Sequence, residues 1–131
     1  MKIFGVGTDI VKTNRIQKLL RRKNVLEKLF NKEEIIKCKR IKKMANCFAK
    51  RFAAKEAFSK ALGTGISKGI YFNQIVVLNE KNGKPFINLS NRVQKYIKKK
   101  TPNGYEIIIN VSISDEKDYV ISNVIISLQK K

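Results

Sequence analysis

The sequence contains no histidine and no tryptophan, and only 10 of its 131 residues are aspartate or glutamate. Without histidine, a serine–histidine triad and a histidine-ligated zinc site are both excluded. Cys38 and Cys47 are nine positions apart, which fits neither a CxxC redox motif nor a zinc-ligand pattern. We therefore expect two free thiols in a reducing compartment. Any catalysis must use carboxylates, lysines, hydroxyls or a hard metal ion.

Long apolar runs are also missing. No stretch approaches the roughly 20 residues of a membrane span, and residues 1–11 lack the apolar segment of a secretory signal. We expect no membrane segment, and any targeting peptide to have been removed. A length of 131 residues suits one domain with a real core rather than two. The prediction is a single domain over residues 1–131.

Basic residues are in large excess, with 29 lysines and arginines and a formal net charge of +19. Residues 12–50 alone hold 14 basic and 3 acidic side chains. Such a field favours a polyanionic or acidic partner. A basic nucleic-acid-binding module is one alternative function, although no recognised motif of that class is present. Lysine enrichment from an AT-rich genome would raise the charge without any partner.

The hydrophobic pattern changes its period along the chain. Expected strands cover residues 2–11, 73–78, 86–87, 105–114 and 119–128. Expected helices are one capped by Thr13, two short ones with capping boxes at Asn24/Glu27 and Asn31/Glu34, a long one over 43–62, and one capped by Ser90 that ends at Lys100. This order is typical of an α+β fold with a mostly antiparallel sheet and a long central helix.

Two carboxylates stand in small or apolar surroundings. Asp9 lies in the first expected strand before Ile10, and Glu56 lies among alanines in the long helix. A charge in such surroundings needs a partner. For Glu56 the partner is either a metal ion or Lys60 one turn later, a pair worth about 0.2–0.5 kcal/mol on an exposed helix. For Asp9 the alternative is a helix cap or a bond to local backbone, with Gly5 and Gly7 marking a bulge.

The remaining carboxylates lie in basic helices, beside turns or at strand ends, and we do not expect them to take part in catalysis. They are Glu27, Glu33, Glu34, Glu80, Glu106, Asp115, Glu116 and Asp118. Asp9 and Glu56 are left. Two converging carboxylates without histidine or thiol nearby are hard oxygen ligands, which Mg²⁺ takes together with waters and substrate phosphates. The residues alone leave the metal ion and Lys60 open as partners of Glu56.

Several segments together resemble the holo-acyl-carrier-protein synthases, a family of 4′-phosphopantetheinyl transferases. The matching segments are Gly7-Thr8-Asp9, the block from Arg51 to Gly65, Asn82-Gly83-Lys84-Pro85 and Val111-Ser112-Ile113-Ser114. The resemblance covers essentially the whole chain, and the block from Arg51 to Gly65 is its most specific part. It favours the metal ion as the partner of Glu56.

The resemblance implies the 4′-phosphopantetheinyl transferase fold and transfer of the phosphopantetheine arm of coenzyme A to a serine of apo-acyl carrier protein, a step of fatty acid biosynthesis. Asp9 and Glu56 would hold Mg²⁺, and Lys55 would help neutralise the diphosphate. Coenzyme contacts are implied for Arg51, Lys55, Ser59, Lys60, Gly63, Thr64, Gly65, Lys84, Pro85, Ser112 and Asp115. The family forms trimers with sites at the subunit clefts. The expected location is the bacterial cytoplasm or a plastid matrix.

The chain departs from the family at one position. Many family members carry histidine where this chain has Asp115, which puts the role of that side chain in doubt.

A cationic stripe lies along the exposed face of the first expected helix. Its members are Arg15, Lys18, Arg21 and Arg22. By resemblance, this stripe would meet the acidic helix of acyl carrier protein. The alternative for this stripe is a solvated helix face.

Overall fold

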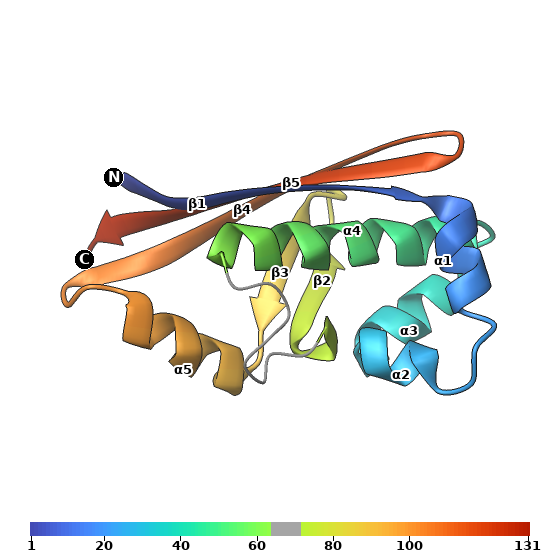
Figure 1. The fold of residues 1–131 in the computed structure, drawn as a ribbon, viewed down its shortest axis with the longest axis horizontal. Helices are drawn as coiled ribbons and strands as arrows, with labels where there is room; N and C mark the ends of the chain where they lie inside the picture. Colours follow the sequence, from blue (N-terminus) through green and yellow to red (C-terminus); the bar gives the residue numbers. More distant parts are fainter. Residues whose placement is uncertain (64–71) are drawn as a thin grey trace.

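A long helix, α4 (Met44–Leu62), runs through the centre of the molecule, and most of its side chains are buried (Figure 1). Alanines alternate along it with Phe48, Phe52 and Phe58, so apolar side chains face neighbouring elements on several sides. The helix ends at Gly63, whose φ of 81° lies in the left-handed region that glycine adopts without strain. The expected helix over residues 43–62 is confirmed.

A three-stranded antiparallel sheet covers one side of α4 (Figure 1). Its strands, in spatial order, are β1 (Lys2–Lys12), β5 (Tyr119–Lys130) and β4 (Tyr105–Glu116). At Gly5 and Gly7 of β1, an added Cβ would overlap the carbonyl oxygens of Ala61 and Ala57. Glycine is required here because the strand and helix backbones approach so closely. The strand register also shifts between Ile3 and Gly5.

The computed structural model describes residues 1–63 and 72–131. The smaller elements are α1 (Thr13–Leu19), α2 (Val25–Leu29), α3 (Lys32–Lys39), the 3₁₀ turn η1 (Phe72–Gln74), the antiparallel pair β2 (Ile75–Asn79) and β3 (Pro85–Leu89), and α5 (Asn91–Lys100). Helices α1 to α3 gather at one end of α4 and α5 lies at the other (Figure 1). The α+β prediction with mostly antiparallel sheets is confirmed.

The ends of the short helices differ in part from expectation. The capping box of Asn31 and Glu34 and the Ser90 cap are both formed. Thr13 is instead the first residue of α1, after Lys12 at the cap position. Asn24 takes a left-handed φ of 63° and its side chain caps none of the described backbone, so the predicted box with Glu27 is wrong. A left-handed residue directs its side chain away from the N–H groups that a cap must reach.

The free-thiol prediction is wrong, because Cys38 and Cys47 form a disulfide. Cys38 lies near the end of α3 and Cys47 in the first turn of α4, and their Cα atoms are 5.5 Å apart. The short connection between the helices turns the chain back on itself, so two cysteines nine positions apart meet in space. The argument for a reducing compartment fails with it. Among the described helices, none is long and apolar enough to cross a membrane.

Candidate active site

The close contact between β1 and α4 brings Asp9 and Glu56 to one region of the surface. The Asp9 side chain is 15% exposed and Glu56 is half-buried. Burial raises the pKa of the Glu56 carboxyl, and the negative charge of Asp9 raises it further. Each carboxylate therefore lies within the electrostatic reach of the other.

Two cations face this carboxylate pair. The Nζ atom of Lys60 donates to Asp9 Oδ1 at 3.1 Å and to the carbonyl oxygen of Thr8 at 2.9 Å. Lys60 and Arg15 also partly offset the rise in the pKa of Glu56. The direct ion pair of Lys60 is thus with Asp9 across the two elements, and not with Glu56 one turn away on its own helix.

The donor set suits a hard divalent cation. Two carboxylates that repel one another are stabilised by a cation placed between them, and carboxylate oxygens are the ligands that Mg²⁺ prefers. No cluster of three or more acidic or cysteine side chains that could hold a metal occurs among residues 1–63 and 72–131. A metal bound by Asp9 and Glu56 would need waters and substrate phosphates as its other ligands. Metal binding by this pair stays a prediction.

Lys55 occupies a different environment from the one expected. It is fully buried, and its Nζ donates to Glu34 Oε1 at 2.6 Å and to the carbonyl oxygens of Phe72 and Ile75 at 2.8 and 2.7 Å. Burial lowers its pKa to about 8, while Glu34 acts in the opposite direction. All three N–H bonds of the ammonium group are therefore used inside the protein. Contact of Lys55 with coenzyme stays a prediction that this geometry does not favour.

Glu34 lies in a basic helix, α3, as the sequence predicts, but it is not a surface acid. Its side chain is fully buried, and besides Lys55 it accepts hydrogen bonds from the backbone N–H groups of Asn31 and Val77. The carboxylate thus joins α3, α4 and β2. The capping box identified its helical position, but not the strand that covers it.

The other predicted coenzyme residues lie in three places. Ser59 is buried and its hydroxyl donates to the carbonyl oxygen of Glu56, one turn earlier in α4. Thr64 and Gly65 fall outside the described residues, directly after Gly63. Ser112 is exposed on β4. These positions alone do not bring the residues to one ligand.

Asp115, at the far end of β4, contacts the start of α4. It accepts a hydrogen bond from Asn46 at 3.1 Å and lies 3.6 Å from Lys50. The Asp115 carboxylate therefore already has two partners at the start of α4.

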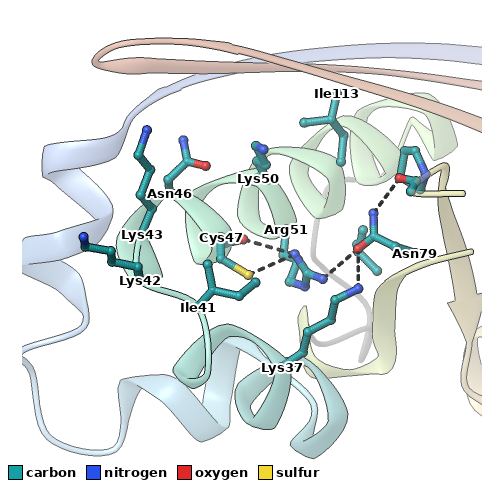
Figure 2. Close-up of a pocket in the computed structure, with 13 residues that line it drawn as sticks. Lys37, Ile41, Lys42, Lys43, Asn46, Cys47, Lys50, Arg51, Asn79 and Ile113 are labelled. Atoms are coloured by element: carbon teal, nitrogen blue, oxygen red, sulfur yellow. Dashed lines mark hydrogen bonds between the residues drawn. The ribbon is translucent and has the colours of Figure 1, made fainter. Parts of the chain in front are cut away.

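A cationic cavity of about 510 Å³ opens on the other flank of α4 (Figure 2). It includes two residues predicted to contact coenzyme, Arg51 and Pro85, while Lys84 lies exposed in the adjoining turn. Four lysines that sequence reasoning did not single out also line it, namely Lys37, Lys42, Lys43 and Lys50. None of the described residues that line it is acidic. Such a cavity suits a ligand with phosphate groups.

Arg51 is the most deeply placed cation of this cavity, at 4% exposure. Its guanidinium donates to Asn79 Oδ1 at 3.0 Å and to the carbonyl oxygen and Sγ of Cys47, both at 3.3 Å (Figure 2). Its Nε is buried without a hydrogen-bond partner among the described residues. Burial lowers the pKa of Arg51, whereas the nearby charge of Glu34 raises it. No described carboxylate forms a salt bridge with this buried cation.

The carboxylate pair and the cationic cavity lie on opposite flanks of the protomer. Asp9 is on β1 and the cavity includes Ile113 of β4, and these strands are the two edges of the sheet. Around α4, Glu56 and Arg51 are separated by about 140° at 100° per residue. The two regions of one chain therefore face away from each other.

The four residues of the predicted docking stripe are all exposed. Arg15 and Lys18 lie on α1, but this helix ends at Leu19, so Arg21 and Arg22 follow it in a turn. The expectation of one continuous helical stripe is therefore wrong in its second half. The cations still belong to the same end of the molecule.

Comparison with known proteins places the chain in a family. The model of the 4′-phosphopantetheinyl transferase superfamily matches residues 5–123. A holo-[acyl-carrier-protein] synthase from Pelagibacter ubique is 43% identical over 132 residues, covering 100% of both sequences. The resemblance to holo-acyl-carrier-protein synthases is thereby confirmed.

Solved structures agree with this result. The holo-[acyl-carrier-protein] synthase of Neisseria meningitidis superposes with a TM-score of 0.85 at 35% identity, over 95% of this chain and 98% of that one. The enzyme of Bacillus anthracis in complex with CoA (3′,5′-ADP) gives 0.79 at 35% identity, over 96% and 97%. The chain described here belongs to the 4′-phosphopantetheinyl transferase superfamily.

Proposed function

We propose that this protein is a holo-acyl-carrier-protein synthase, which transfers the 4′-phosphopantetheine arm of coenzyme A to a serine of apo-acyl carrier protein. The serine oxygen bonds to the phosphorus that carries the pantetheine, and the bond from that phosphorus to the bridging oxygen of the diphosphate breaks. The serine gives its proton to a carboxylate of the site or to a water molecule, and adenosine 3′,5′-bisphosphate leaves with the electron pair. The names of the relatives and the bound CoA (3′,5′-ADP) of one of them support this activity.

The convergence of Asp9 and Glu56 at the contact of β1 with α4 is the observation that carries the mechanism. These carboxylates would hold Mg²⁺ against the diphosphate, where the metal supplies charge neutralisation. Lys60, which donates to Asp9, orients that carboxylate and adds positive charge beside the diphosphate. The nucleotide end of the coenzyme would occupy the cationic cavity around Arg51.

The assembly that fits these two regions is a homotrimer, as the family resemblance implies. Each site would combine Asp9 and Glu56 of one protomer with the cationic cavity of its neighbour. An exposed apolar face on the outer side of the sheet supports association: Val6 pairs with Ile125 and Ile10 with Ile121 in register, and all four are exposed. Contiguous apolar surface of this kind is typical of protein–protein interfaces.

Acyl carrier protein would dock at the exposed cations of the α1 end, where Arg15 also reaches the field of Glu56. Docking there would bring the carrier serine near the carboxylate pair. The second candidate, a nucleic-acid-binding module, finds no support in the comparisons. The reaction would serve fatty acid biosynthesis in the bacterial cytoplasm or a plastid matrix.

A mass-shift assay tests the function. Purified protein is incubated with apo-acyl carrier protein, coenzyme A and Mg²⁺, and the carrier should gain the mass of one phosphopantetheine arm. Asp9→Asn and Glu56→Gln should remove at least 99% of the rate, with the exposed Glu33→Gln as the matched control. An unmodified carrier protein with the wild-type enzyme would refute the proposal.

A further inference from the structure

One neutral side chain organises the two inner cations of the cavity. Asn79 Oδ1 accepts from Arg51 at 3.0 Å and from Lys37 Nζ at 2.9 Å (Figure 2). Its Nδ2 atom donates to the carbonyl oxygen of Gly83 at 3.0 Å. The amide therefore joins a helix-borne arginine, a lysine of α3 and the turn that precedes Pro85.

The charge balance at this point is incomplete. Arg51 and Lys37 share one acceptor that carries no charge, and no described carboxylate forms a salt bridge with either. Burial, and then the positive charge of Arg51, lower the pKa of Lys37. Two cations held together in this way are stabilised when an anion joins them. The buried Nε of Arg51 provides a further N–H group that lacks a partner in the described structure.

We infer that Asn79 is a positioning residue for phosphate binding, which holds Arg51 and Lys37 side by side to receive a phosphate group at the nucleotide end of coenzyme A. This inference rests on the proposed function and extends it to three residues from three different elements. Asn79 itself does not need to touch the coenzyme. Its amide aligns the two cations without neutralising them, and a carboxylate in its place would compete with the phosphate.

The chemistry explains why an amide suits this position. A carboxylate would bind both cations more strongly and cancel part of their charge. An apolar side chain would leave Arg51 and Lys37 without a common acceptor, so their mutual repulsion would move them apart. Only a neutral acceptor keeps both the geometry and the charge.

Titration calorimetry with adenosine 3′,5′-bisphosphate tests the inference directly. Asn79→Ala should weaken the Kd about 10-fold, the loss expected when a hydrogen bond to charged groups no longer aligns them. Asn79→Asp keeps the size and the acceptor but adds a charge, and should weaken binding more at low salt than at high salt. Asn88→Ala, an exposed asparagine on the neighbouring strand β3, is the matched control and should bind as wild type does.

Steady-state kinetics separate positioning from folding. Both Asn79 variants should raise the KM for coenzyme A and leave kcat within about twofold, whereas partial unfolding would lower the apparent kcat at unchanged KM. If Asn79→Ala does not fold, the isosteric Asn79→Asp variant carries the test. Wild-type Kd and KM in the Asn79 variants would overturn the inference while the transfer activity stood. A wild-type enzyme that neither transfers the arm nor binds the bisphosphate would refute the proposed function itself.

Discussion

The buried ion pair of Lys55 and Glu34 should dominate the stability of the junction between α3, α4 and β2. Both side chains are 0% exposed, and the Nζ to Oε1 distance is 2.6 Å. Removing one charge of a buried pair leaves the other without compensation, which costs about 3–5 kcal/mol. We therefore expect Glu34→Gln to lower the free energy of unfolding by that amount, although glutamine has nearly the same shape.

The double variant gives the sharper result. Lys55→Met alone should destabilise the fold because Glu34 keeps its charge in the interior. Combining it with Glu34→Gln removes both charges, so the double variant should be more stable than the sum of the single losses predicts. Urea unfolding of the four proteins measures this coupling, with Glu33→Gln, one residue away and exposed, as the control. Additive losses, or a loss below about 1 kcal/mol for Glu34→Gln, would refute the reasoning.

The pH dependence provides an independent measurement of the same pair. The pKa of Lys55 is about 8 in the folded protein against its ordinary value of 10.5. Between these two values the unfolded chain binds more protons at this lysine than the folded chain does, so its contribution to stability rises with pH from about 8 to 10.5. Lys55→Met should lack this rise. A wild-type stability that falls through the same window in parallel with the variant would contradict the direction of the shift.

Three further predictions concern other parts of the molecule. Reducing the disulfide of Cys38 and Cys47 should lower the free energy of unfolding by about 2.7 kcal/mol, the chain-entropy value for a loop of about ten residues. Urea unfolding with and without a phosphine reductant measures this loss, and equal unfolding midpoints would contradict the prediction. Arg15→Glu should raise the KM for acyl carrier protein at low salt and leave coenzyme A binding unchanged; an unchanged KM would make the docking surface ordinary surface charge. Asp115→His should change the KM for coenzyme A more than kcat, and loss of turnover in Asp115→Ala at unchanged binding would instead make Asp115 the general base.

The fold was largely predictable because local pattern and tertiary structure agree along most of the chain. The change from a period near 3.6 to a period of two marks the passage from α4 to the later strands. Gly63 ends the long helix, and the hairpin of β4 and β5 follows from two β-rich runs separated by a short polar turn. In each case the signal lies within the element that it describes.

The candidate site was predictable only where a residue conflicts with its own surroundings. Asp9 and Glu56 stand out because each is an acid among small or apolar neighbours. Glu34 gave no such signal, since Lys32 and Glu33 precede it in a helix rich in charged residues and its polar partners Lys55 and Val77 are distant in sequence. Asn79 was missed for the same reason, because its three partners come from α3, α4 and the turn after β2.

The last prediction concerns the separation between the carboxylate pair of Asp9 and Glu56 and the cationic cavity around Arg51. A sheet of three strands places Asp9 on one edge and the cationic cavity beside the other, so under the proposed function the diphosphate and the nucleotide end of coenzyme A would be bound by different protomers. If the apolar face that includes Val6 packs against a neighbouring protomer so that β1 lies near β4 of that neighbour, each contact would bring a carboxylate pair to a cationic cavity. Substituting Val6→Glu on the apolar face should then both separate the protomers and abolish transfer, because activity and assembly would depend on the same contact. A monomer by light scattering that retains full activity would show that one protomer holds the complete site.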